Sequence, residues 1–303
     1  MKKIVITGAT GLIGSTIANN LKESGYHICA FSRDPVRAKK ELPAADETAK
    51  WDTDDPVIWE NHLSEAYGVI NLAGANIAAK RWSDEYKKIL YDSRIDGTRR
   101  ISETINKLDN KPKVFLSASA VDYYGNKGEE KITENASPGN NFLSKICKDW
   151  EAEAKKCEDN TRLVIGRFAT VLDDNEGALA KMVPFFKMCI GGPLGPGDQW
   201  FPWVHWDDIA GMIHDAIEND DISGIYNFCS PNPVRMNEFA KALGRALDRP
   251  SWFRVPEFLI NIVMGEGASM ITSSKRVLPH KILEEGYRFK FDNIDQAMKD
   301  LFK

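Results

Sequence analysis

Short apolar runs alternate with helical patterns along the first half of the chain. The runs are rich in Val, Ile, Leu and Phe and lie at 2–7, 26–33, 67–74, 113–120 and 161–168. Segments with apolar side chains at helical spacing lie at 12–25, 83–108 and 144–157. Strands that are apolar on both faces and alternate with helices predict an α/β fold with a doubly wound parallel sheet.

The second half of the chain is less regular. A Gly-, Pro- and Trp-rich segment at 191–206 predicts a loop. Beyond it we expect a helix over 207–219, a strand over 224–230, and a helix that is capped at Asn237 and runs to residue 248. The pattern predicts a main domain over 1–230, with its sheet core at about 1–170, and a smaller C-terminal lobe over 250–303.

Composition narrows the range of partners. The net charge of −4 over 303 residues argues against nucleic acid or an anionic membrane as the main partner. The five cysteines form no CxxC pair and the five histidines show no HxH or HExxH spacing, so we expect reduced thiols and no metal site. Neither a signal peptide nor an apolar stretch of membrane-spanning length is evident, and we expect a soluble, cytoplasmic protein.

A glycine-rich turn follows the first apolar run. The sequence "TGATGLIG" places Gly8, Gly11 and Gly14 between a strand and a helix. In that context the first glycine permits a tight turn, the second lets a pyrophosphate approach the backbone, and the third lets helix and strand pack closely. The motif therefore predicts a dinucleotide-binding site.

The end of the second apolar run indicates which dinucleotide is bound. NAD-binding proteins place an acidic residue there for the ribose 2′-hydroxyl, whereas this chain has Ser32 and Arg33. Arg33 can pair with a 2′-phosphate, which favours NADP(H), although a solvated surface arginine would look the same. Asp34 fits a turn better than a ribose contact, and Asp52 is expected to end the next strand near the adenine.

Several motifs together bring a known family into view. "TGATGLIG", "NLAG", "SASAVDYYG" and "GRFATVL" resemble the extended short-chain dehydrogenase/reductase superfamily, which contains sugar-nucleotide epimerases and dehydratases. "WEAEA", "GGPLGPGDQWFPWVHWDDIAG" and "SKRVLPHKILEEGYRFKF" resemble its atypical epimerase family branch, with the C-terminal domain of unknown function typical of that branch. The resemblance implies a Rossmann-type domain with NADP(H) and a C-terminal substrate lobe.

The resemblance also implies a set of cofactor contacts. They would line the pyrophosphate, the 2′-phosphate end, the adenosine ribose and the nearby sheet edge, and they are Thr7, Gly8, Thr10, Gly11, Leu12, Ile13, Gly14, Ser32, Arg33, Asp52, Leu72, Ala73, Gly74, Arg94 and Ser117. Arg94 stands where extended relatives carry Asn, and its charge could contact the cofactor or simply lie on a helix surface.

The catalytic dyad of the superfamily is missing from its expected place. Relatives carry Tyr-x-x-x-Lys-x-x-x-Glu on one helix, where a lysine cation lowers the pKa of the tyrosine that transfers the proton. Counting back from Glu151 puts Cys147 at the lysine and Leu143 at the tyrosine. Neither side chain can replace the standard group, because leucine has no proton and a buried thiol stays protonated.

Other side chains could handle the proton. Ser119 fits the serine that orients the substrate oxygen in relatives, with Ser117 as the alternative register. Tyr123 and Tyr124 could supply a phenol or pack as aromatics, and His205 could act as an acid or base or stay structural.

Two functions remain open from the sequence. The first is an NADP(H)-dependent oxidoreductase or epimerase that acts on an unknown small polar or nucleotide-linked molecule. The second is a non-catalytic NADP(H)-binding sensor or interaction protein. The protein is expected to be a monomer or a homodimer, since relatives often dimerise through the helices at 85–107 and 144–157.

Overall fold

The glycine turn joins the first strand to the first helix as the sequence predicts. The computed structural model describes residues 1–51 and 57–303. β1 (Lys3–Thr7) alternates its side chains, with Ile4 and Ile6 packed on one face of the sheet and Val5 on the other. The helix that follows, α1 (Leu12–Glu23), is capped by Ser24, and the next residue, Gly25, has a φ of +88° in the left-handed region.

The sheet contains seven parallel strands, which confirms the predicted fold class. Their order is β11-β7-β5-β4-β1-β2-β3. The strands are β1, β2 (His27–Ser32), β3 (Glu47–Lys50), β4 (Gly68–Asn71), β5 (Val114–Ala120), β7 (Arg162–Phe168) and β11 (Gly224–Phe228). The strand order reverses between β1 and β4, and ligands of open α/β sheets bind at the carboxyl ends of the strands beside such a reversal.

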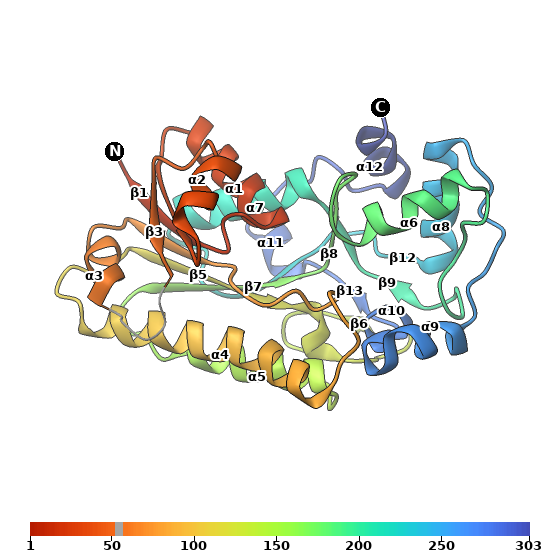
Figure 1. The fold of residues 1–303 in the computed structure, drawn as a ribbon, viewed down its shortest axis with the longest axis horizontal. Helices are drawn as coiled ribbons and strands as arrows, with labels where there is room; N and C mark the ends of the chain where they lie inside the picture. Colours follow the sequence, from red (N-terminus) through yellow and green to blue (C-terminus); the bar gives the residue numbers. More distant parts are fainter. Residues whose placement is uncertain (52–56) are drawn as a thin grey trace.

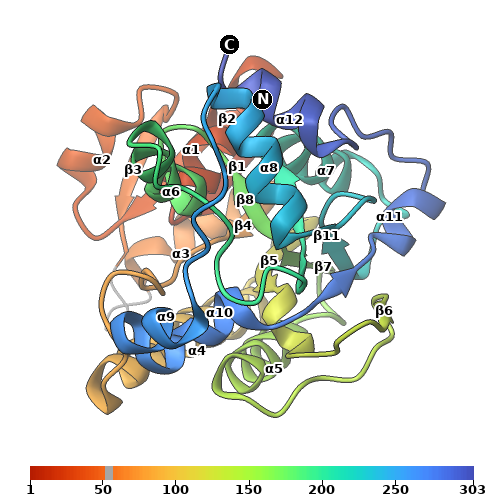
Figure 2. The same ribbon diagram turned by 90° about the vertical axis from the view of Figure 1, so that its right-hand side faces the viewer.

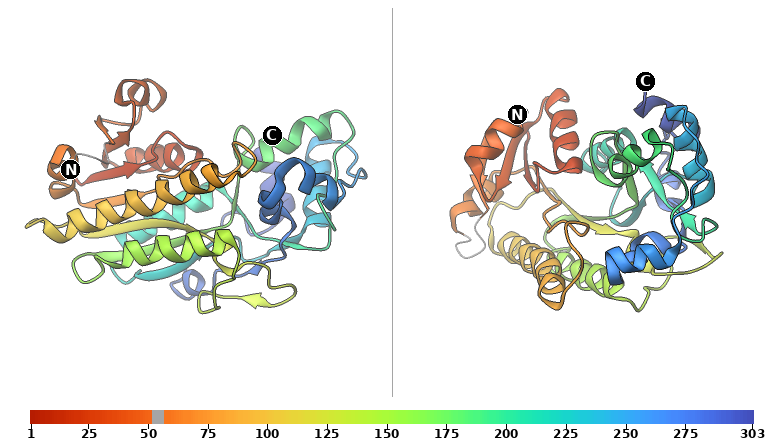
Figure 3. Two further views of the ribbon diagram at one scale, coloured as in Figure 1. Left: turned by 60° about the horizontal axis from the view of Figure 1, so that its bottom comes forward. Right: turned by 45° about the vertical axis from the view of Figure 1, so that its right-hand side comes forward.

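Helices cover both faces of this sheet. α1 and α7 (Trp206–Glu218) lie together on one face, while α4 (Asp84–Lys107) and α5 (Phe142–Lys155) lie on the other (Figure 1). Two further views show α4 and α5 running side by side (Figure 3). α2 (Pro35–Glu41) and α3 (Val57–Ser64) belong to the same half of the molecule, with β2 and β3.

A second lobe packs beside the carboxyl ends of the strands (Figure 1). Its helices are α6 (Gly177–Lys187), α8 (Met236–Leu247), α9 (Glu257–Met264), α10 (Ser269–Thr272) and α12 (Ile294–Leu301). The short helix α11 (His280–Glu284) packs against β11 at the edge of the sheet instead. Short strands and 3₁₀ turns lie in this lobe or connect it to the sheet. They are β6 (Lys131–Ile132), β8 (Thr170–Leu172), β9 (Trp200–Phe201), β10 (Trp203–His205), β12 (Val234–Arg235), β13 (Arg276–Val277), η1 (Val121–Tyr124) and η2 (Gly265–Ala268). Figure 2 shows the extended segment that connects α8 to α9 along this lobe.

The lobe is built from more of the chain than its expected range of 250–303. One apolar core contains side chains of α6, α8 and α12, so the middle of the chain contributes to it as well. The Trp-rich segment at 191–206 is not only a loop, because it contains β9 and β10. The expected cap at Asn237 is also wrong, because α8 begins at Met236 and its N-cap residue is Arg235. The Glu238 carboxylate accepts the Arg235 N–H at 3.0 Å.

The described parts of the chain contain no helix with both the length and the apolar character needed to cross a bilayer. None of the five cysteines, all of which lie among the described residues, forms a disulfide bond.

Candidate functional site: a nucleotide cradle beside a buried polar network

The three glycines of the turn differ in how much room the fold leaves for a side chain. Gly8 has a φ of +68°, and a Cβ there would lie 2.8 Å from the Leu72 carbonyl oxygen. A Cβ on Gly14 would lie 2.3 Å from the Gly8 carbonyl oxygen, so α1 could not pack against the turn. A Cβ on Gly11 would meet only that same oxygen, at 3.4 Å, which is an ordinary contact. The fold does not demand glycine at Gly11, and close approach by a ligand is the remaining reason for it.

The loop after β4 is held to the turn by hydrogen bonds. Thr7 Oγ1 donates to Asn71 Oδ1 at 2.7 Å and accepts the backbone N–H groups of Leu72 and Ala73 at 3.2 Å. Thr7 therefore holds the backbone of the loop that continues to Gly74 in place beside the glycine turn. Thr10 is exposed at the tip of the turn, and Leu12 and Ile13 are half-buried at the start of α1. These residues bring the predicted pyrophosphate contacts to one place.

At the end of β2, an arginine that could bind a ligand is followed by an aspartate that already caps a helix. Arg33 is exposed and forms no hydrogen bond or ion pair with any described residue. Asp34 caps α2, since its Oδ1 accepts the Arg37 N–H at 3.0 Å. Ser32 Oγ stays within the same turn, bonded to the backbone of Asp34. Asp52 lies outside the described residues.

Arg94 turns inward from α4 toward the loop after β4. It donates to the carbonyl oxygens of Leu90 and Ala75 at 3.0 and 3.1 Å, and its guanidinium lies over the Trp150 ring at 5.4 Å. A Cβ on Gly74 would lie 3.0 Å from its Cζ. No described carboxylate pairs with this cation, and desolvation lowers its pKa. Arg94 is thus not a helix-surface charge, and it stays a predicted contact for an anionic group.

Leu143 and Cys147 lie on the buried face of α5, each less than 5% exposed. Burial, followed by the charges of Asp122 and Glu151, raises the pKa of the Cys147 thiol to about 12. This thiol is protonated at neutral pH and cannot serve as a cation or a base. The nearby lysines do not compensate, since Lys145 and Lys148 are exposed and Lys145 pairs with Asp149.

Ser119 is part of a buried polar network instead of facing a ligand. Its Oγ donates to Glu151 Oε1 at 2.7 Å, and Arg167 binds both oxygens of that carboxylate at 2.8 Å. All three side chains are at most 4% exposed. The only proton of the Ser119 hydroxyl is thus donated to Glu151, and its role in orienting a substrate oxygen stays a prediction. Ser117 is 1% exposed and its hydroxyl has no described partner, so its contact with the cofactor stays a prediction.

The two tyrosines after β5 have different surroundings. The Tyr124 hydroxyl is fully buried, donates to Asn227 Oδ1 at 2.7 Å and accepts from Arg167 Nη1 at 2.8 Å. Burial raises its pKa well above that of free tyrosine, so Tyr124 is structural and the prediction of a catalytic role is corrected. Tyr123 is half-buried and packs against the Arg167 guanidinium, whose Cζ lies 3.5 Å from the ring centre. Its hydroxyl bonds to no described residue, so Tyr123 remains a candidate.

His205 is structural as well. It is fully buried at the start of α7, where its Nδ1 accepts the Asp207 N–H at 3.2 Å. The ring stacks on Phe291 at 3.9 Å, and Nε2 faces Asp300 at 3.7 Å without a hydrogen bond. Burial lowers its pKa to about 4. The prediction of a catalytic His205 is corrected, because its contacts are those of a helix cap beneath the C-terminal lobe.

One charged pair was not predicted from the sequence. Lys275, from the segment before β13, reaches Asp122 of η1, and its Nζ lies 2.7 Å from Asp122 Oδ1. The Lys275 side chain is 4% exposed and that of Asp122 is 24% exposed. Buried lysines are rare unless they are paired, which is the signal that marks this position once burial is known. The pair stands directly after the carboxyl end of β5.

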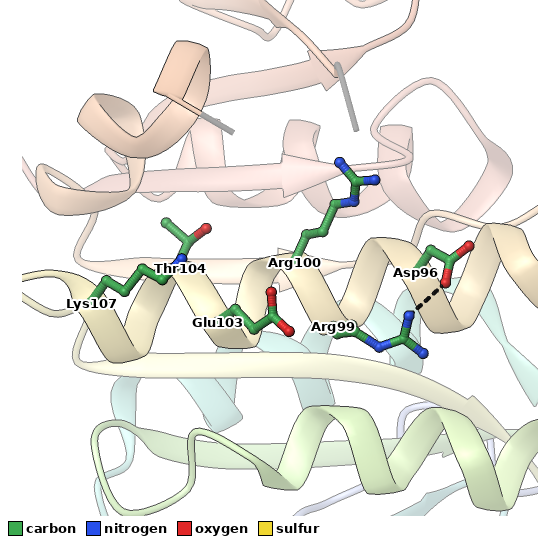
Figure 4. A pocket seen from close by; sticks show the side chains of 6 residues that line it. All are labelled: Asp96, Arg99, Arg100, Glu103, Thr104 and Lys107. Carbon is green, nitrogen blue, oxygen red and sulfur yellow. Dashed lines mark hydrogen bonds and ion pairs between the residues drawn. The ribbon is translucent and has the colours of Figure 1, made fainter. Parts of the chain in front are cut away.

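Two other clusters of charged groups do not belong to this site. A surface hollow on α4 is lined only by polar side chains that all rise from this helix, as Figure 4 shows: Asp96, Arg99, Arg100, Glu103, Thr104 and Lys107. Such a lining offers no apolar wall for a nicotinamide or adenine ring. Cys29, Glu47 and His62 also gather closely, but the Lys3 ammonium already bonds to Glu47 and His62 at 2.8 and 3.2 Å. A metal ion there would have to displace that cation.

The sheet reversal beside the glycine turn defines a Rossmann-type dinucleotide-binding protein. Residues 4–229 match the NAD dependent epimerase/dehydratase family, and residues 255–301 match a domain of unknown function, DUF1731. The chain belongs to the NAD dependent epimerase/dehydratase family, as the motifs suggested.

Several relatives resemble the chain along its whole length. An epimerase family protein SDR39U1 homolog of Arabidopsis thaliana, described as chloroplastic, is 37% identical over 99% of this chain and 86% of its own. An epimerase family protein of Staphylococcus aureus is 36% identical, with both chains fully covered. The structure of human epimerase family protein SDR39U1, solved with NADPH, superposes with a TM-score of 0.89 at 28% identity and covers 99% of this chain and 98% of its own.

Proposed function

We propose that this protein binds NADP(H) and uses it as an oxidoreductase on a small polar or nucleotide-linked substrate. The observation that carries the proposal is the exposed Arg33 at the end of β2, which forms no hydrogen bond or ion pair with any described residue. The neighbouring carboxylate, Asp34, is occupied as a helix cap and is not free to hold a ribose 2′-hydroxyl. The similarity to a human protein solved with NADPH supports the same cofactor.

A role in catalysis is supported by the groups at the carboxyl end of β5. When bound, NADPH supplies a hydride, and the chain must then provide binding, orientation and a proton. A charged pair, Asp122 and Lys275, and the half-buried Tyr123 stand where a substrate would meet the sheet end. We favour an oxidoreductase over a sugar epimerase, because the tyrosine that handles a sugar hydroxyl is replaced by Leu143. We place this activity in the cytoplasm, in keeping with the unpaired cysteines.

The alternative is a non-catalytic NADP(H)-binding sensor, which Leu143 and Cys147 favour. The two functions separate in one assay, in which the protein and NADPH are mixed with a panel of carbonyl compounds and nucleotide sugars while nicotinamide absorbance is followed. Turnover supports the oxidoreductase. Tight NADPH binding without turnover on the panel supports the sensor.

The cofactor assignment is tested by substituting Arg33. We expect R33A to weaken NADPH binding by about 10- to 100-fold, the loss of one to two charge-assisted hydrogen bonds, and to leave NADH binding unchanged. Fluorescence titration of each nucleotide measures this. The matched control is R288A, which removes an exposed arginine of the C-terminal lobe that also has no described partner. Tighter binding of NADH than NADPH by the unmodified protein would overturn the assignment.

A further inference from the structure

Lys275 is held in place by the C-terminal lobe and directed at the Rossmann-type domain. Its backbone N–H donates to the Trp200 carbonyl oxygen at 3.2 Å, and the next two residues form β13, which pairs with β6. The side chain then crosses to η1 and bonds to Asp122. Asp122 is itself fixed, because its carbonyl oxygen accepts the Ser144 hydroxyl of α5 at 2.8 Å. Contacts from both lobes, made by β13, η1 and α5, thus fix the position of the Lys275 ammonium group.

The hydrogen-bonding capacity of this ammonium group is mostly unused. A lysine carries three N–H donors, and Asp122 Oδ1 is the one acceptor of Nζ among the described residues. The side chain is 96% enclosed, so donors without partners there are costly. An oxygen of a bound molecule would satisfy them. Asp122 is less enclosed and stands at the carboxyl end of β5, where ligands of open α/β sheets bind.

Apart from Tyr123, which is only half-buried, the other proton carriers near this point are already committed or unsuited. The Ser119 and Tyr124 hydroxyls donate to Glu151 and Asn227 within the buried network. The Cys147 thiol is enclosed on α5. Arg94 is a permanent cation that does not release its proton in proteins. Lys275 is therefore the enclosed group that combines a charge, a transferable proton and free donors.

We propose that Lys275 Nζ binds the carbonyl oxygen of the substrate and donates the proton of the reaction, with Asp122 as its positioning partner. This rests on the proposed NADPH-dependent reduction. The carbonyl carbon receives the hydride, the π electrons of the C=O bond move to oxygen, and that oxygen takes a proton as one N–H bond of Lys275 breaks. The resulting neutral amine then regains a proton from water beside Asp122, whose side chain is 24% exposed.

The test compares variants of the full chain loaded with NADPH. The probes are four small carbonyl compounds, glyoxylate, pyruvate, glyceraldehyde and benzaldehyde, and their binding is read from the fluorescence of the bound nicotinamide. We expect at least one probe to bind and K275M to weaken that binding by at least about tenfold, as for a lost charge-assisted hydrogen bond. K275R, which keeps the charge but cannot release a proton, should retain more of the probe binding than K275M and show no turnover. K290M is the control, since Lys290 is an exposed lysine of the same lobe that pairs with Asp207 at 2.9 Å.

The outcomes separate this inference from the proposed function. If the unmodified protein fails to bind NADPH, the proposed function fails. If NADPH binds but no probe does, or if K275M binds the probe as tightly as K290M, only the assignment of Lys275 is overturned. D122N is a second variant for the case that K275M does not fold, because it keeps the lysine and removes only the charge that positions it. We expect D122N to bind the probe more weakly than the unmodified protein but more tightly than K275M, and to bind NADPH as the unmodified protein does.

Discussion

At the scale of single residues, neighbouring positions of one motif serve different purposes. Gly14 is surrounded by backbone atoms that leave no room for a side chain, whereas Gly11 has space above it. The same contrast separates Tyr124, which is bonded on both sides within the buried network, from Tyr123, whose hydroxyl has no described partner. Packing against the protein and availability to a ligand can thus be distinguished residue by residue.

This contrast makes a prediction for two glycine variants. G11A should keep its free energy of unfolding within ~1 kcal/mol, because Gly11 has an extended backbone and an added methyl group clashes with nothing. It should nevertheless bind NADPH much more weakly, since the methyl group would occupy the predicted place of the pyrophosphate. G14A should lose at least ~2 kcal/mol through overpacking. Urea unfolding and NADPH titration of both variants measure these effects, and equal stability of the two would contradict the explanation.

At the scale of elements, the buried network holds the sheet and α5 in register. Glu151 comes from α5, Ser119 from β5, Arg167 from β7 and Asn227 from β11, and Tyr124 of η1 closes the chain of bonds. The ion pair at its centre has almost no contact with solvent. Breaking one side of such a pair leaves a buried charge without compensation, which costs more than removing both sides.

The network predicts a specific pattern of stabilities. E151Q should lower the free energy of unfolding by ~3–5 kcal/mol, because Arg167 stays buried without its counter-charge. The double variant E151M/R167M should lose less than E151Q, since it buries no charge. E41Q, which removes an exposed pairing with Arg37 on α2, should change stability by less than ~1 kcal/mol. Urea unfolding tests all three, and a double variant that is less stable than E151Q would speak against the argument.

The sequence predicted the elements better than the partners of their side chains. Apolar runs and helical spacing placed the long strands and helices, because periodicity is a local property. The two-residue strand β9 was missed since so short a run has no period. The glycine turn was also predictable, because its residues are adjacent. The Ser119–Glu151 bond and the Asp122–Lys275 pair join positions 32 and 153 residues apart, and only the fold brings them together.

At the scale of the whole molecule, α7 attaches the C-terminal lobe to the sheet. The buried Asp208 carboxylate accepts the backbone N–H groups of Lys290 and Phe291 at 2.8 and 3.0 Å. His205 lies beside it, stacked on Phe291 and facing Asp300 of α12. The attachment therefore depends on polar groups that are enclosed between the two lobes. Because Lys275 also belongs to the C-terminal lobe, the stability of this attachment matters for the proposed site.

The enclosure of His205 makes the stability of the molecule depend on pH. Its pKa in the folded protein, about 4, lies below the ordinary value of 6.5, because burial disfavours the charged ring. Above pH 6.5 neither state binds this proton, and the full stability is present. As the pH falls from 6.5 to 4, the unfolded chain takes up a proton that the folded chain refuses, so the free energy of unfolding decreases by up to ~3 kcal/mol from this group alone.

H205N should flatten this dependence, because asparagine can still accept the Asp207 N–H but does not titrate. Urea unfolding of both proteins between pH 6.5 and 4 measures the difference, which isolates His205 from the carboxylates that titrate in the same range. H280N removes an exposed imidazole that pairs with Glu284 and serves as the control, which we expect to follow the unmodified protein. If H205N lost stability with the same slope as H280N, protonation of His205 would not be the cause, and its Nε2 would have to be solvated in the folded state.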